Sequence, residues 1–269
     1  MGTINETAEF LCEAAASGVN FDTVLSIGRQ SLYLRQPDLA RLGRRFNIAS
    51  PGDALDAYSE RFFKQFLGAA DVQSIDYSDY EGATVGHDMN LPIPPALEGR
   101  FDAVIDGGAL EHIFNFPVAI ANCMKMVKPG GRLFIFGPAN NQMGHGFYQF
   151  SPELFYRALS DANGFEVERM QAVEFKFLAT EFGSVRKYAV KDPYSIRDRV
   201  TVGNSLPVGL MVQARKVRVV HDLFSNAPQQ SDYQAIWSKD APPQGGALRR
   251  LSKLLPLSIR RPLAPILFI

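Results

Sequence analysis

Short apolar runs alternate along the chain with segments in which apolar residues recur every three or four positions. The runs predict buried strands, and the spaced residues predict helices that cover a sheet. Strands are expected at residues 23–28, 72–75, 83–86, 101–106, 132–137, 165–173 and 208–214, and helices at residues 3–17, 51–67, 117–127 and 152–163. Residues 31–50 and 174–206 show no clear period and are expected to be irregular.

The clearest unit is the stretch of residues 101–138. An apolar strand ends at Asp106, a helix begins near Pro117, and the turn Lys128-Pro129-Gly130-Gly131 leads into another apolar strand. Proline suits the first turn of a helix, whereas a proline–glycine turn ends one. A strand–helix–strand unit of this length predicts a right-handed parallel crossover. Ligands of such sheets bind beyond the carboxyl ends of the strands, so residues 106–112 and 138–145 are expected to carry the site.

Several helix ends have sequence signals. Asn5 is expected to cap the first helix and Gly18 to end it, Ser50 and Asp53 form a capping box before the second, Gly68 ends that helix, and Ser151 and Gly164 bound the last. Residues 208–214 are expected to form an antiparallel edge strand beside residues 165–173. The prediction is a three-layer α/β sandwich with a mostly parallel, doubly wound sheet and a C-terminal antiparallel hairpin.

The order of segments predicts one domain and a tail. Residues 1–221 are expected to fold as the domain, residues 222–247 are polar and expected to be loosely ordered, and residues 248–269 form a basic and apolar tail. The tail has five basic residues and no acidic one. It is expected to pack back on the domain, to form a dimer contact, or to touch an anionic membrane surface.

Composition narrows the class of protein. Of the 269 residues, 46% are apolar, which supports a sizeable core, and 28 basic residues balance 28 acidic ones. Nothing in that balance suggests a nucleic-acid partner. The two cysteines, Cys12 and Cys123, lie on expected apolar helix faces and fit a reducing compartment. No signal segment or membrane span is seen, so the cytoplasm is the expected location. Four scattered histidines do not suggest a metal site.

The sequence LEH at residues 110–112 and the turn KPGG at residues 128–131 carry a family resemblance. Together with the strand order, they make residues 21–216 similar to class I S-adenosylmethionine-dependent methyltransferases. The resemblance implies a Rossmann-like fold, S-adenosylmethionine as cofactor, and methyl transfer to an oxygen or nitrogen of a small-molecule acceptor.

The resemblance also implies roles for five residues. Gly28 matches the first glycine of the cofactor loop, and Asp76 matches the acid that accepts both ribose hydroxyls. Asp88 matches the acid near the adenine amino group, with Met89 against the ring, and Asp106 matches the residue beside the amino group and the sulfonium.

Two histidines near the same sheet edge are candidates for removing the acceptor's proton. His112 follows the strand that ends at Asp106, and His145 lies in a glycine-flanked loop, followed by aromatic residues that could wall a pocket: Phe147, Tyr148 and Phe150. Imidazole titrates near neutrality and suits that proton transfer. A plain structural alternative remains for each, because His112 could cap the following helix and the His145 loop could dock its aromatic residues on the core.

The first loop supports a rival from another functional class. It keeps one glycine in the sequence Gly28-Arg29-Gln30-Ser31-Leu32, which would suit a non-catalytic, methyltransferase-like binding protein that has lost the cofactor loop. A nicotinamide-dependent dehydrogenase is a weaker rival, because no G-x-G-x-x-G follows any expected strand. The arginines at positions 35, 41, 44 and 45 either attract an anionic substrate or form a solvated face.

Overall fold

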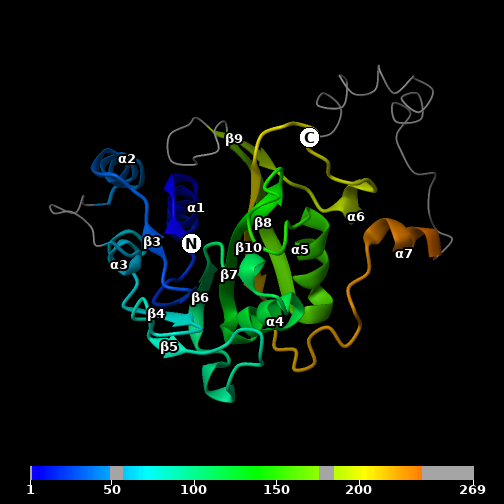
Figure 1. Cartoon of the computed structure of the whole chain (residues 1–269), viewed down its shortest axis with the longest axis horizontal. Coiled ribbons are helices and arrows are strands. Elements are labelled where there is room, and N and C mark those ends of the chain that lie inside the picture. The colour runs from blue at the N-terminus through cyan, green and yellow to red at the C-terminus, as the bar shows by residue number, and fades with distance from the viewer. Residues whose placement is uncertain (1, 49–56, 176–184, 238–269) are drawn as a thin grey trace.

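In the computed structural model, which describes residues 2–48, 57–175 and 185–237, eight strands form a central sheet with the order β5-β4-β2-β6-β7-β10-β8-β9 (Figure 1). These strands are β2 (Thr23–Ile27), β4 (Asp71–Asp76), β5 (Val85–Gly86), β6 (Phe101–Asp106), β7 (Val127–Asn140), β8 (Phe165–Phe175), β9 (Val185–Ala189) and β10 (Val208–Lys216). The strands from β5 to β7 run parallel, and β10, β8 and β9 add antiparallel pairs. A small parallel pair joins β1 (Gly2–Thr3) to β3 (Ser31–Leu32).

Helices cover both faces of the sheet. The first face carries α1 (Asn5–Ala16), α2 (Gln36–Phe46) and α3 (Glu60–Leu67), and the second carries α4 (Phe116–Met126) and α5 (Pro152–Ala158) (Figure 1). Along β6, Ala103 and Ile105 belong to the apolar core on the first face and Val104 to the core on the second, because successive strand side chains point to opposite faces. This arrangement confirms the three-layer α/β sandwich with a mostly parallel sheet.

The central unit forms as expected. Strand β6 occupies residues 101–106, α4 begins at Phe116 with Pro117 in its first turn, and β7 lies parallel to β6. The parallel register places Ile27 beside both Ile75 and Asp106, so the carboxyl ends of β2, β4 and β6 meet at one edge. That edge is where the sequence places the ligand site.

Strand β10 is a correction to the predicted order. It pairs with β7 on one side and with β8 on the other, and β9 is the edge strand instead. Residues 208–214 alone do not distinguish these places, because an apolar strand fits either an edge or the interior of a sheet.

Two segments that were expected to be irregular contain helices. Residues 36–46 form α2, which has Pro37 in its first turn, Asp38 accepting from the Arg35 backbone N–H, and buried Leu39 and Leu42. The many arginines of this segment lie on its outer face and obscure the pattern. Short helices also form at α6 (Pro193–Ile196) and, within residues 222–247, at α7 (Ser231–Trp237).

Some helix ends differ from expectation. Asn5 is the first residue of α1 rather than its cap, and the Thr7 hydroxyl accepts from the Ile4 N–H at 2.9 Å. Helix α5 is capped by Ser151 as expected but ends at Ala158, and Gly164 ends a separate 3-10 turn (Asp161–Asn163). Helix α3 begins at Glu60 and ends before Gly68. The capping box at Ser50 and the tail at residues 248–269 lie outside the described residues.

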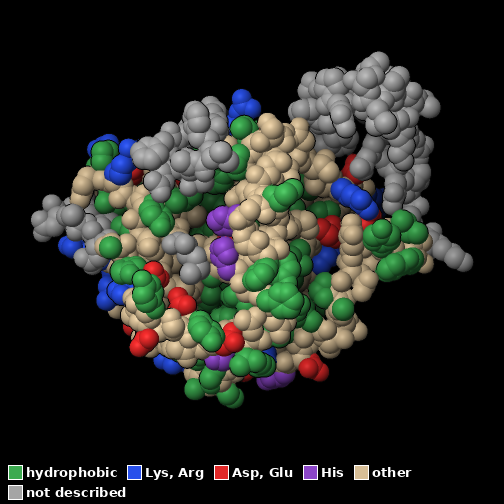
Figure 2. Space-filling view, in the orientation of Figure 1, with side chains coloured by type: hydrophobic (Ala, Val, Ile, Leu, Met, Phe, Trp, Pro, Cys, Tyr) green, Lys and Arg blue, Asp and Glu red, His purple; other side chains and the backbone are tan. Residues whose placement is uncertain are grey.

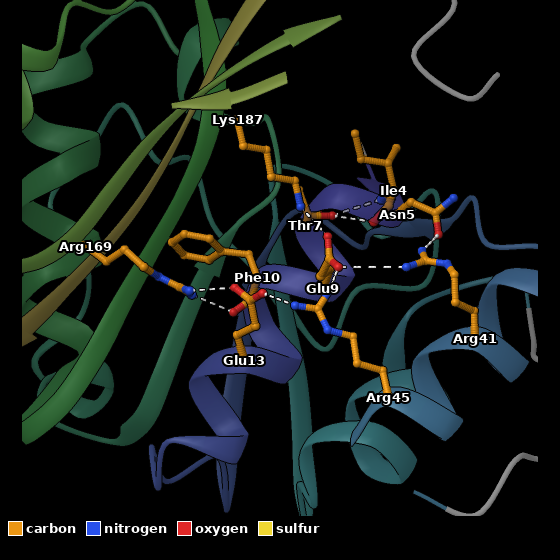
Figure 3. Close-up of polar contacts among 10 residues, drawn as sticks. All are labelled: Ile4, Asn5, Thr7, Glu9, Phe10, Glu13, Arg41, Arg45, Arg169 and Lys187. Atoms are coloured by element: carbon orange, nitrogen blue, oxygen red, sulfur yellow. Dashed lines mark hydrogen bonds and ion pairs between the residues drawn. The ribbon is translucent and has the colours of Figure 1, made fainter. Parts of the chain in front are cut away.

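Helix α1 is held to its neighbours by ion pairs (Figure 3). Two of its three acidic residues pair with basic residues of α2, β8 and β9: Glu9 with Arg41, Arg45 and Lys187, and Glu13 with Arg45 and Arg169. The Arg169 guanidinium also lies 3.5 Å from the centroid of the Phe10 ring. Arg41 and Arg45 therefore have structural partners, which accounts for much of the arginine cluster without an anionic substrate.

Lys216, the last residue of β10, joins the hairpin to α4. Its side chain is buried and its Nζ donates to backbone carbonyls at the end of that helix, at 2.9 Å to Met124 and 2.8 Å to Val127. Burial lowers the pKa of this ammonium. Both cysteines are buried and free, Cys12 in α1 and Cys123 in α4. Within the ranges described, no helix is long and apolar enough to cross a bilayer.

Candidate active site at the carboxyl edge of the sheet

The chain leaves β2 through a sharp turn at Gly28. This residue has a φ of 71°, and its N–H donates to the Ile75 carbonyl of β4 at 2.7 Å. Glycine adopts such a φ without steric cost. The turn therefore lies directly beside Asp76, the residue that ends β4. The two residues that the family resemblance assigns to the cofactor loop and the ribose acid are brought together.

The next two candidates differ in exposure. Asp76 is partly exposed and accepts from the Tyr77 N–H at 2.7 Å, so its carboxylate remains at the surface. Asp88 accepts from the backbone N–H and the side-chain amide of Asn90, and these hydrogen bonds hold the pKa of its carboxyl below the usual value. Met89 is 5% exposed and packs in the core cluster that contains α4.

Asp106 is fully buried at the end of β6. Its Oδ1 accepts from the N–H groups of Ala109 and Leu110 at 2.8 and 3.2 Å, which shapes the turn into the short 3-10 helix Leu110–His112. Burial, together with the nearby carboxyl of Glu111, raises the pKa of Asp106 well above its usual value. In this conformation its carboxyl supports the turn from inside.

The N-terminal strand and Gln30 cover the end of β6. Gln30 is buried, donates to the Ile105 carbonyl at 3.1 Å and accepts from the Thr3 hydroxyl at 3.3 Å. The Gly2 N–H donates to the Gly107 carbonyl at 3.3 Å. A Cβ on Gly107 would lie 2.5 Å from Gln30 Oε1, so the glutamine amide packs directly on this glycine. Sequence patterns gave no reason to single out Gln30 or Thr3.

Glu111 is the centre of a cluster with the two candidate histidines. Its side chain is 1% exposed, and its Oε1 lies 3.3 Å from His145 Nε2 and 4.0 Å from His112 Nε2. Burial raises the pKa of Glu111 to about 7. Burial, and then the neighbouring His145, lower the pKa of His112. The two imidazoles are about half exposed, with ring centroids 5.3 Å apart, and Figure 2 shows histidine side chains side by side near the centre of this face.

Backbone contacts hold His145 in this cluster. The N–H groups of Phe147 and Tyr148 both donate to the Glu111 carbonyl, at 2.8 and 3.3 Å. Gly146 has a φ of 76°, and a Cβ there would lie 2.7 Å from that same carbonyl. The loop after β7 therefore docks on the turn after β6, and the structure brings together the two histidines that the sequence had separated by a whole helix and strand.

A cavity of about 140 Å³ opens beside Glu111 and His145. Its apolar wall comes from Phe136, Val173, Phe175, Leu210 and Met211, and its remaining lining includes Glu6 and the backbone of Gly107 and Gly108. The aromatic residues expected to wall this pocket lie elsewhere: Phe147 is 67% exposed, and Phe150 is 2% exposed in the core. The sheet itself, through β7, β8 and β10, supplies the wall.

Two buried carboxyls line this cavity: Glu6, which no sequence pattern indicated, and Glu111, which the sequence placed at the expected site edge without a role of its own. Burial raises the pKa of Glu6 as it does that of Glu111. Each has one buried carboxyl oxygen, Oε2, with no hydrogen-bond partner among the described residues. The LEH motif contains Glu111, but only its burial distinguishes it from an exposed turn residue. The cavity thus joins an apolar wall to acidic and imidazole groups that can orient a polar atom and accept a proton.

Residues 59–135, which run from the start of α3 into β7, match a family model described as a methyltransferase domain. Three of the solved structures that are similar to the chain are the following. A protein of Bacillus halodurans assigned as a methyltransferase is 14% identical, with a TM-score of 0.43 over 78% of this chain and 99% of that one. A 1,6-didemethyltoxoflavin-N1-methyltransferase of Burkholderia thailandensis with S-adenosylhomocysteine bound is 17% identical, with a TM-score of 0.37 over 79% of this chain and 81% of that one. A 16S rRNA adenine methyltransferase of Catenulisporales acidiphilia is 16% identical, with a TM-score of 0.38 over 79% of this chain and 94% of that one. At these scores the likeness says nothing of substrate. No curated protein sequence matches the chain.

Proposed function

We propose that this chain is a class I S-adenosylmethionine-dependent methyltransferase and that it methylates an oxygen or nitrogen of a small-molecule acceptor held beside Glu111; the match over residues 59–135 and the order of the strands support this proposal. The observation that carries the proposal is the cavity at the carboxyl edge, where an apolar wall meets Glu111 and His145. S-adenosylmethionine supplies a methyl group on a sulfonium, and transfer breaks the carbon–sulfur bond and leaves a neutral thioether.

The nucleoside half of the cofactor fits the residues at the ends of β2 and β4. Asp76 presents a partly exposed carboxylate beside the Gly28 turn, and a carboxylate can accept from both hydroxyls of a ribose. The region over Gly107 differs from the partly exposed region at Asp76, because the side chains of Gln30 and Thr3 fill the space next to the end of β6. We therefore assign Asp76 to ribose binding, with Gly28, Asp88, Met89 and Asp106 shaping the rest of the edge.

The acceptor side is proposed to lie at Glu111, His112 and His145. Glu111 and His145 line the cavity and His112 lies beside them, so an acceptor atom bound there would have two imidazoles nearby that can take up its proton. The volume of about 140 Å³ suits a small acceptor, and the apolar wall would exclude water from one side of it. A cytoplasmic location and a C-terminal contact with a membrane or a second copy remain predictions.

Replacement of Asp76 tests the cofactor assignment. Asp76→Ala removes two charge-assisted hydrogen bonds to the ribose and is expected to weaken S-adenosylmethionine binding by about 2 kcal/mol, or roughly 30-fold. Isothermal titration calorimetry with S-adenosylmethionine and with S-adenosylhomocysteine measures this loss. Asp79→Ala is the matched control, because it removes the same charge from an exposed position in the same loop.

Two outcomes would contradict this assignment. Equal affinity for Asp76→Ala and the unaltered protein would remove Asp76 from the site while leaving the enzyme in place. No binding by the unaltered protein at about 1 mM cofactor would instead favour a methyltransferase-like binding protein. That second candidate is supported by one observation, the packing of Gln30 and the N-terminal strand over Gly107.

The two histidines are tested by turnover. With an acceptor found by following S-adenosylhomocysteine release across small hydroxyl and amino compounds, His112→Ala and His145→Ala are each expected to lower kcat about 10²-fold. Cofactor affinity should stay unchanged, since neither side chain is assigned to cofactor binding. His221→Ala, at an exposed position, is the control. Full activity in both cluster variants would mean that positioning alone drives the transfer.

A further inference from the structure

Glu111, His112 and His145 form a ligand set that the sequence did not reveal. One carboxylate oxygen and two imidazole nitrogens, one atom from each residue, all lie within 4.8 Å of one another. His112 adjoins Glu111, but His145 comes from the loop after β7 and reaches the cluster because its neighbours Phe147 and Tyr148 bond to the Glu111 backbone. Scattered histidines in a sequence therefore become a compact group in the fold.

The buried carboxyl is the second observation that points to a ligand. Glu111 is 1% exposed, both histidines are about half exposed, and Glu111 Oε2 has no hydrogen-bond partner among the described residues. Burying a carboxyl without partners is costly, and a bound cation is one way to offset that cost. The imidazole nitrogens lie nearest the other oxygen of the same carboxyl, Oε1, so a cation between the three groups would bind a carboxylate that otherwise keeps an unpartnered atom.

The distances between the three candidate ligand atoms are close to those found around a bound metal ion. Three ligands about 2.1 Å from one ion lie roughly 3 to 3.5 Å apart. The contact from His145 Nε2 to Glu111 Oε1 is already 3.3 Å, and that from His112 Nε2 is 4.0 Å. A cation site therefore requires the half-exposed His112 ring to move closer to the buried Glu111, whereas His145 already lies at the required distance.

We propose that Glu111, His112 and His145 bind one divalent transition-metal ion of the Zn²⁺ or Fe²⁺ type. Two imidazoles and one carboxylate suit borderline ions such as Zn²⁺, Fe²⁺, Co²⁺ and Ni²⁺, whereas Mg²⁺ and Ca²⁺ prefer all-oxygen sets. Three protein ligands on one side leave positions open toward the cavity that Glu111 and His145 line. The metal site lies on the acceptor side of the proposed active site, but its existence does not depend on whether the protein transfers a methyl group.

The ion would define the acceptor of the proposed methyltransferase. Its open positions select a compound with an oxygen or nitrogen donor that can bind a metal, and a bound cation lowers the pKa of that donor group. With the ion bound, the imidazoles act as ligands instead of as the proton acceptors of the metal-free site described above, and the proton of the acceptor leaves to solvent. This consequence rests on the proposed function, and a chelator would reproduce in the unaltered enzyme the loss of turnover seen in the histidine variants.

Direct metal binding tests the inference without an acceptor or cofactor. After treatment with a chelator, the full-length protein is titrated with Zn²⁺ by calorimetry and with Co²⁺ by visible absorption, which reports ligand type and geometry. One equivalent is expected to bind, and His145→Ala is expected to weaken that binding at least about 100-fold. His145 is half exposed, so this variant is expected to fold, and circular dichroism checks it.

The controls separate this cluster from adventitious binding. His221→Ala removes an exposed histidine outside the cluster and should leave the affinity unchanged, whereas Glu111→Gln should reduce it as His145→Ala does. Absence of saturable binding by the unaltered protein, or equal affinity in His145→Ala and the unaltered protein, overturns the metal site. Neither result bears on S-adenosylmethionine binding at Asp76, which the calorimetry with cofactor tests separately.

Discussion

Gly164→Ala is expected to destabilise the protein by about 4 kcal/mol, the sum of backbone strain and a steric clash. Gly164 has a φ of 74° before β8, and a Cβ there would lie 2.4 Å from the Arg218 carbonyl. The clash involves backbone, which cannot rotate away: the N–H of Val217 donates to the Gly164 carbonyl at 2.8 Å and holds the two segments together. Chemical denaturation in urea measures the change in the free energy of unfolding.

Gly130→Ala is the matched control for this variant. Gly130 has a similar φ of 84°, but a Cβ there would meet no atom within 4 Å. Its cost should therefore be limited to the left-handed conformation, about 1 to 2 kcal/mol. If the two variants lose the same stability, the contact between Gly164 and the segment after β10 does not contribute as described.

Lys216→Met is expected to lower the free energy of unfolding by about 3 kcal/mol, because it leaves buried carbonyl acceptors without their charged donor. The Nζ donates to Met124 and Val127 at 2.9 and 2.8 Å, at the end of α4, where the helix dipole also favours a cation. Methionine has a similar length and fills the volume, so the loss reports the hydrogen bonds rather than a cavity. Urea denaturation measures this change in the free energy of unfolding, and thermal unfolding provides a second measurement.

Lys125→Met provides the comparison at the same helix end. Lys125 is about one third exposed and lies 3.7 Å from Glu98, an ion pair that water screens. Its replacement should cost less than about 1 kcal/mol. A similar small effect for Lys216→Met would show that water replaces the buried ammonium at these carbonyls.

The parallel half of the fold follows closely from the sequence. Residues 101–106 are apolar apart from Asp102 and stop at a carboxylate, and Pro117 and the turn KPGG mark the ends of the following helix. These local signals are strong because a crossover unit allows one handedness and one direction of pairing. The positions of Gly28, Asp76 and Asp106 at a common edge follow directly from that topology.

The parts that were wrong depend on contacts between distant segments. The insertion of β10 between β7 and β8 is decided by pairing across the sheet, which local periodicity does not encode. Helix α2 was obscured by arginines whose partners, Glu9 and Glu13, lie on α1. In the same way, His145 joins Glu111 through loop backbone hydrogen bonds, and the cavity wall comes from strands rather than from the expected aromatic loop.

The central place of β10 has a consequence for synthesis on the ribosome. Strand β8 is joined to the sheet through β10, and one edge of β7 is paired only by β10. A nascent chain that has emerged only as far as residue 207 therefore presents an open, apolar β7 edge, the kind of surface that recruits chaperones or pairs with other chains. Chains truncated before Val208 should for this reason aggregate, although they contain all of the matched residues 59–135 and every residue assigned to the cofactor or to proton transfer.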